Sequence, residues 1–103
     1  MLDRLTKANF AENLETRFQL QLTSTQTIEL KLIELREGRS TPRQEQFALL
    51  FQGPLINPLG QGLWPIRHET LGQFDLFLVS SGRDEEGLYY EAVFNRLLPR
   101  NPS

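Results

Sequence analysis

The residues best suited to chemistry stand in one short stretch, GLWPIRHE, at residues 62–69. It contains the only tryptophan, Trp64, and the only histidine, His68, of the 103-residue chain. Because the chain has no cysteine, the usual pairs of nucleophile and base reduce to His68 acting with the adjacent glutamate and with Ser80 or Ser81. No G-x-S-x-G turn is present to expose a serine, and nothing in the spacing requires a triad. We therefore expect no catalytic residue and no enzymatic activity.

The other polar clusters have simpler explanations than a metal or cofactor site. His68 and its neighbour Glu69 point to opposite faces of a strand, whereas metal ligands must converge. The acidic run at 84–86 lacks the alternating oxygen spacing of a calcium loop and is typical of a solvated hairpin tip. Asp75 and Glu91 could face each other as paired carboxylates on neighbouring strands, but solvent-facing positions explain both equally well. The sequence therefore predicts no metal and no cofactor.

The composition of the chain limits the classes of partner that it could bind. The net charge is -2, with 11 basic and 13 acidic residues spread along the chain, which argues against nucleic acid or an anionic membrane as a partner. The N-terminal residues lack a secretory signal and no apolar run is long enough to span a membrane, so we expect a cytoplasmic protein. The length suits a single domain over residues 1–103, with residues 1–5 and 99–103 as frayed ends.

The hydrophobic pattern predicts one helix and then strands. Thr6 is a suitable N-cap for a short helix with the sequence TKANFAENLE, whose apolar residues, Phe10 among them, lie on roughly one side. Alternation in FQLQL and TIELKLIELRE indicates strands, and the change of apolar parity near residues 32 and 33 indicates a bulge or bend. We expect a polar, mobile loop at 37–45 after the second of these strands.

The second half of the chain contains four further strand patterns. They are QFALLFQG, LWPIRHE, FDLFLVSSG and LYYEAVFNRL, of which the first and third are apolar on both faces. In LWPIRHE, the parity places Trp64, Ile66 and His68 on an inner face, with His68 able to hydrogen-bond the following turn. Pro65 cannot donate to a ladder, which places this strand at an edge, a seam or a bulge.

These elements favour a mainly β fold. Short connections indicate an antiparallel meander of about six strands, and closing it into a small β-barrel with the N-terminal helix at one end removes its two edges. An open α+β sheet is the alternative.

Several motifs together resemble a family of small bacterial domains of unknown function. They are L-T-x-x-x-F (Leu5, Thr6 and Phe10), FALLFQGP, QGLWPIRHETLGQFDLFLVSSG and GLYYEAVFNR. The match departs in the loop at 36–46 and at Trp64, where a tyrosine is more usual. The resemblance implies a compact, mainly β domain without a known activity. It also implies an association with tail-fibre-like proteins of phage origin.

Two function classes remain open beside the hydrolase. The leading hypothesis is a non-enzymatic structural or protein-binding module, an accessory or adaptor of a phage-tail-like assembly, that docks a protein partner or a second copy of itself. The alternative is a barrel that holds a small apolar ligand, with Trp64, Tyr89 and Tyr90 around its mouth. The candidate binding residues are Trp64, Pro65, His68, Tyr89 and Tyr90.

Overall fold

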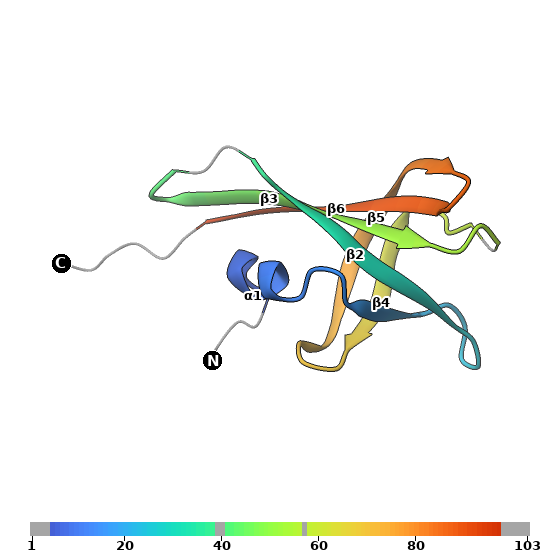
Figure 1. Ribbon diagram of the computed structural model, residues 1–103. Coiled ribbons are helices and arrows are strands. Elements are labelled where there is room, and N and C mark those ends of the chain that lie inside the picture. The colour runs from blue at the N-terminus through green and yellow to red at the C-terminus, as the bar shows by residue number, and fades with distance from the viewer. Residues whose placement is uncertain (1–4, 39–40, 57, 98–103) are drawn as a thin grey trace.

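The computed structural model describes residues 5–38, 41–56 and 58–97 and contains one helix and six strands (Figure 1). Their bounds are α1 Lys7–Glu12, β1 Arg17–Gln21, β2 Thr27–Glu37, β3 Gln44–Gly53, β4 Gly62–His68, β5 Gly72–Asp84 and β6 Gly87–Leu97. All strand pairs are antiparallel, and the sheet closes in a ring. The mainly β barrel expected from the sequence is confirmed, and no helix among the described residues is long and apolar enough to cross a membrane.

The strand order corrects the expected simple meander. The ring runs β1-β2-β3-β6-β5-β4, so two three-stranded meanders are joined through β3 with β6 and through β1 with β4. The hairpins of each meander are local and follow from the turn residues. The two closing pairs join strands far apart in sequence, and the alternation within a strand does not specify which distant strand it will meet.

Helix α1 begins where the sequence predicts. Thr6 is the N-cap, and its side-chain oxygen accepts a hydrogen bond from the Asn9 backbone N–H at 3.0 Å. The helix ends at Glu12, earlier than the apolar pattern suggested, with Asn13 as the C-cap. Leu5, expected in the frayed N-terminus, packs against the core. The rest of the two ends expected to fray, residues 1–4 and 99–103, lies outside the described residues.

The predicted bulge in the second strand is present. The pairing of β2 with β3 shifts register between Leu32 and Glu34, which leaves Ile33 as the extra residue. The loop expected at 37–45 is shorter than predicted, because β2 continues to Glu37 and β3 begins at Gln44. Residues 39 and 40 of that loop lie outside the described residues.

The inward-facing residues of every strand form one hydrophobic core. Its largest fully buried side chains are Phe10, Phe18, Phe47, Phe51, Leu20, Leu30, Leu32, Leu49 and Leu78. Inner and outer positions alternate along the strands, as the period of two requires. The strand part of the core is thus built by residues that the alternation marked as apolar and inward, whereas Phe10 comes from helix α1 and Leu59 and Leu71 come from connections between strands.

Helix α1 closes the end of the barrel where β5 and β6 separate. The β5–β6 pairing begins at Val79. The first part of β5, Gly72–Leu78, pairs with β4 on one edge and has no ladder to β6 on the other among the described residues. Phe10 of α1 fills this opening. It is fully buried, and its ring lies within 6.4 Å, centroid to centroid, of four other phenylalanine rings, namely Phe18, Phe47, Phe74 and Phe94.

The loop between β3 and β4 closes the other end. Its Leu59 is buried in the core cluster, and the Leu59 backbone N–H donates to the hydroxyl of Tyr90 at 3.0 Å. The Trp64 indole N–H donates to the carbonyl of Gly60, also at 3.0 Å. Two aromatic side chains therefore hold this loop over the barrel end through their polar atoms.

Candidate partner-binding surface

His68 is a buried structural residue at the α1 end of the barrel. Its Nδ1 accepts hydrogen bonds from the backbone N–H groups of Thr70 and Leu71 at 3.0 and 3.1 Å, which is the contact to the following turn that the sequence predicts. Nδ1 is therefore unprotonated, and Nε2–H donates to the Thr16 hydroxyl at 2.9 Å. That hydroxyl donates to the carbonyl of Asn13 at 2.6 Å. Burial lowers the pKa of His68, and Glu69 opposes this only in part.

The structure does not assemble the triad considered for His68. His68 pairs with Gly72 at the start of β5, whereas Ser80 lies eight residues further along that strand. At a strand rise of about 3.3 Å per residue the separation is roughly 26 Å. Both ring nitrogens of His68 are also engaged in the bonds described above.

The other polar candidates do not converge either. Asp75 lies opposite Pro65 on β4, whereas Glu91 lies opposite Val79 on β5, so the two carboxylates do not face each other. Within the described ranges, no group of three or more histidine, aspartate or glutamate side chains is arranged to hold a metal ion. Trp64 and Tyr90 hold the β3–β4 loop, and Tyr89 points to the opposite face from Tyr90. The three aromatic residues do not line a common mouth.

Tyr89 belongs to the hairpin between β5 and β6. Its hydroxyl donates to Asp84 Oδ2 at 2.8 Å, while Asp84 Oδ1 accepts from the backbone N–H groups of Glu86 and Gly87. The Tyr89 hydroxyl and these backbone donors lower the pKa of Asp84. Gly87 is required by close approach, since a Cβ there would lie 2.5 Å from the carbonyl oxygen of Gly53. The acidic run is thus an ordered hairpin tip.

Replacing Tyr89 with phenylalanine should raise the pKa of Asp84 towards its ordinary value, because the strongest donor to the carboxylate is removed. NMR titration of the Asp84 carboxyl carbon measures this directly. A Gln52→Ala variant, which loses a contact to the Tyr89 hydroxyl but none to Asp84, is the control. An unchanged titration in Tyr89→Phe would contradict the assignment.

Pro65 marks the seam of the barrel. Strand β4 pairs with β5 along its whole length, but with β1 only at Gln19 with Arg67 and Leu20 with Ile66. A proline fits such a ladder without losing a bond where its nitrogen points away from the paired strand. The edge that Pro65 indicates is therefore closed by β1 of the same chain, over two residue pairs.

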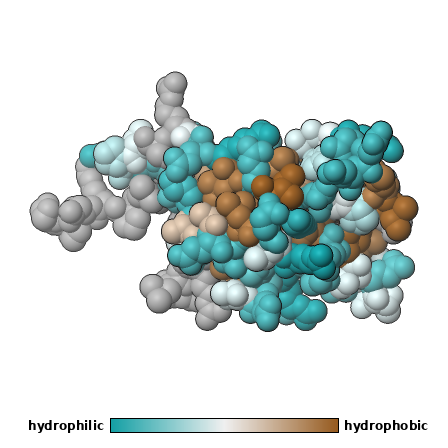
Figure 2. Space-filling model, viewed as in Figure 1, coloured by the Kyte–Doolittle hydropathy of each residue, from teal (hydrophilic) through white to brown (hydrophobic). Residues whose placement is uncertain are grey.

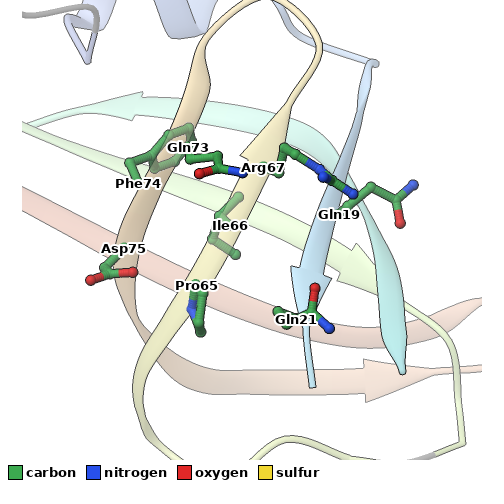
Figure 3. A pocket seen from close by; sticks show the side chains of 8 residues that line it. All are labelled: Gln19, Gln21, Pro65, Ile66, Arg67, Gln73, Phe74 and Asp75. Atoms are coloured by element: carbon green, nitrogen blue, oxygen red, sulfur yellow. The ribbon is translucent and has the colours of Figure 1, made fainter. Parts of the chain in front are cut away.

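A groove lies on the outside of this seam (Figure 3). It has a volume of about 290 Å³ and is lined by Gln19, Gln21, Pro65, Ile66, Arg67, Gln73, Phe74 and Asp75. It adjoins a second hollow of about 510 Å³, which shares Gln19, Arg67 and Gln73 with it. Figure 3 shows the Arg67 side chain reaching across the seam towards Gln19 of β1. The surface is thus hollowed along the short β1–β4 junction.

Exposed apolar side chains gather on the outside of β4, β5 and β6. We call them the outer apolar face, and they are Leu63, Phe77, Val79 and Val93, exposed by 64%, 51%, 37% and 67%. Leu63 and Phe77 are direct cross-strand partners. Val79 lies opposite Glu91, which in turn lies opposite the half-buried Leu50 of β3, and Val93 lies opposite Ala48. Glu91 therefore lies between Val79 and Leu50, and among the four residues only Leu63 and Phe77 are direct cross-strand partners.

The rest of the surface has both polar and apolar areas. Figure 2 shows apolar surface in the middle of the molecule, where β2, β3 and β6 cross, and a second apolar area at the right-hand edge, with polar surface between them. The β3–β4 loop carries two further exposed apolar side chains, Leu55 and Ile56. Single exposed apolar residues are ordinary, but a contiguous set on adjacent strands is a common feature of interaction sites.

Sequence reasoning missed most of this surface. Of the five candidate residues, Pro65 lines the groove and His68 lines the adjoining hollow, whereas the hydrogen bonds of His68, Trp64 and Tyr90 hold the ends of the barrel. The missed residues are Leu63, Phe77, Arg67 and Gln73. The parity of β4 had placed Leu63 and Arg67 on the outer face, and the two-faced apolar pattern of β5 included Phe77. The sequence therefore indicated that these side chains face outward, but it did not indicate which of them lie opposite each other.

Fold and surface together define a small, closed, six-stranded antiparallel barrel, capped by a short helix and apolar on part of its outside. The chain belongs to a family described as a domain of unknown function, DUF6916, whose model matches residues 5–94. No curated protein and no solved structure matches the chain.

Proposed function

We propose that this domain is a non-enzymatic binding module that docks a protein partner through the outer apolar face. The observation that carries the proposal is the pairing of Leu63 with Phe77, both more than half exposed, on neighbouring strands of a rigid barrel. Covering apolar surface of this kind is the main favourable term in protein association.

Charge around the face supports a protein partner. Arg36 on β2 forms an ion pair with Glu34 at 2.9 Å and approaches Glu91 to 3.9 Å, so charges of both signs border the apolar residues. These carboxylates raise the pKa of Arg36. An apolar centre with a polar, mixed-charge rim is the usual composition of a protein interface. A polyanion would instead require a field of one sign, which the net charge of -2 does not supply.

A paired-variant experiment tests the proposal. The wild-type domain should retain a partner from its native extract. The double variant Leu63→Ser with Phe77→Ser should retain at least tenfold less of that partner, because the apolar centre of the interface is removed. The control is Leu55→Ser with Ile56→Ser, which removes a similar exposed apolar pair from the β3–β4 loop. Quantitative mass spectrometry of the captured proteins provides the measurement.

Equal capture by both double variants would overturn the proposal, as would the absence of any protein enriched over a blank matrix. Light scattering on the purified domain identifies the case in which the partner is a second copy. In that case the mass should fall to that of a monomer in the Leu63→Ser, Phe77→Ser variant.

The finer proposal is an accessory or adaptor role in a phage-tail-like assembly, which rests on the resemblance of the motifs described above. It predicts that the captured protein is a tail or fibre component. Capture of an unrelated metabolic enzyme would contradict this setting while leaving the binding role intact.

A further inference from the structure

Arg67 is a cation in the lining of the seam groove that forms no ion pair in the described part of the chain. Arg17 pairs with Glu29 and Arg36 with Glu34, whereas no ion pair or hydrogen bond of the Arg67 guanidinium occurs among those residues. Both hollows that it lines also contain the neutral amides of Gln19 and Gln73, while Asp75 lines the first hollow and Arg17 and Glu69 line the second. Guanidinium and amide N–H groups together form a donor set for a carboxylate.

The groove and the outer apolar face lie on the same side of the same two strands. Three successive outward pairs follow one another along β4 and β5, namely Arg67 with Gln73, Pro65 with Asp75, and Leu63 with Phe77. The polar pair and the apolar pair are four residues apart, which is about 13 Å at the rise of a strand. Pro65, between them, offers a low and apolar surface.

We propose that the partner segment is extended and carries a carboxylate and a large apolar side chain four residues apart on one face. The carboxylate binds Arg67, with Gln19 and Gln73 as further donors, and the apolar side chain packs on Leu63 and Phe77. Alternate residues of an extended strand repeat at the same interval as those of β4, so the two sets of side chains come into register. This inference rests on the proposed function and specifies the chemistry of its partner.

The mixed charge of the two hollows also distinguishes this occupant from others. A membrane surface or a nucleic acid would need several unpaired basic side chains. Arg17, which also lines the second hollow, is paired with Glu29, so Arg67 is the cation of the two hollows that matches a single carboxylate. Asp75 borders the groove on the β5 side and disfavours a second acidic group near Pro65. The surface therefore selects both the number and the position of the acidic residues.

Cyclised β-hairpin peptides are suitable probes, because they present a preformed strand. One pair of hairpins carries glutamate and leucine four residues apart in either order along a threonine-rich strand. A matched pair has the same composition with the two residues three apart, which places them on opposite faces. Binding to the full chain is measured by fluorescence anisotropy with a neutral dye.

We expect at least one of the four-apart hairpins to bind, and the three-apart hairpins to bind at least tenfold more weakly. Arg67→Gln should weaken binding about tenfold to a hundredfold, as for a lost charge-assisted hydrogen bond. Arg43→Gln, which removes another exposed cation outside the groove, should leave binding unchanged. Raised salt should weaken binding to the wild type more than to Arg67→Gln.

The inference is overturned if no hairpin binds, if the spacing makes no difference, or if Arg67→Gln binds as the wild type does. These outcomes are distinct from failure of the proposed function. Partner capture that depends on Leu63 and Phe77 but not on Arg67 leaves the function standing and rejects the carboxylate contact alone.

Discussion

Replacing Phe10 with alanine lowers the free energy of unfolding by about 3–5 kcal/mol. Phe10 is fully buried and is the one side chain of α1 that enters the core, where it contacts phenylalanine rings from β1, β3, β5 and β6. Truncation loses the transfer free energy of the ring and leaves a cavity at the point where β5 and β6 have no ladder between them. Urea denaturation followed by circular dichroism measures the change.

The same substitution at Phe77 is the control. Phe77 is half exposed on the outer face, so Phe77→Ala should cost less than about 1 kcal/mol. The slope of unfolding against urea should stay unchanged in both variants if the barrel remains intact. A Phe10→Ala cost no greater than that of Phe77→Ala would show that α1 does not close the barrel.

Replacing His68 with alanine should lower the free energy of unfolding by about 1–3 kcal/mol at pH 7.5, because buried donors lose their partner. The backbone N–H groups of Thr70 and Leu71 would have no acceptor, and the tilted ring contact of the imidazole with Phe18, at 4.3 Å between ring centroids, would be lost. The same denaturation experiment measures this cost.

The cost should also depend on pH. The pKa of His68 is lowered in the folded state, so the unfolded chain binds the proton more readily as pH falls through the ordinary value of about 6.5. The wild type therefore keeps the full contribution of His68 above that pH and loses it progressively as pH falls towards the lowered pKa. The difference between wild type and His68→Ala should narrow between pH 7.5 and pH 5.5. A constant difference would argue against burial of the neutral ring.

The variant His68→Asn separates the contribution of the hydrogen bonds to the turn from that of the ring contact with Phe18. An asparagine oxygen can accept from the backbone N–H two residues on, so this variant should recover part of the loss while still lacking the contact with Phe18. If alanine and asparagine are equally destabilising, the hydrogen bonds to the turn contribute nothing measurable.

The sequence predicted the outward direction of single residues of the candidate site, but not which of them lie together. The outward parity of Leu63 and Arg67 follows from the alternation of β4, and the parity of β5 places Phe77 on its outer face. That Leu63 lies opposite Phe77, and Arg67 opposite Gln73, depends on register across the β4–β5 hairpin, which its turn determines. The rarity of Trp64 and His68 directed attention to residues that hold the barrel ends instead.

The sequence by itself determined the local features of this protein. The N-cap at Thr6, the bulge at Ile33, the inward faces of the strands and the bonds from His68 to the turn after it all involve residues close together in the chain. Each is governed by hydrogen bonds and side-chain periods that act over a few positions.

Only the tertiary structure decided which distant strands meet. The pairing of β3 with β6 and of β1 with β4 converts two meanders into a ring, places Phe10 in the opening between β5 and β6, and forms the groove under Arg67. Every strand presents the same kind of unpaired backbone edge and an apolar inner face, so nothing local distinguishes one distant partner from another. The choice results from the burial of the whole core at once, to which all the strands contribute together.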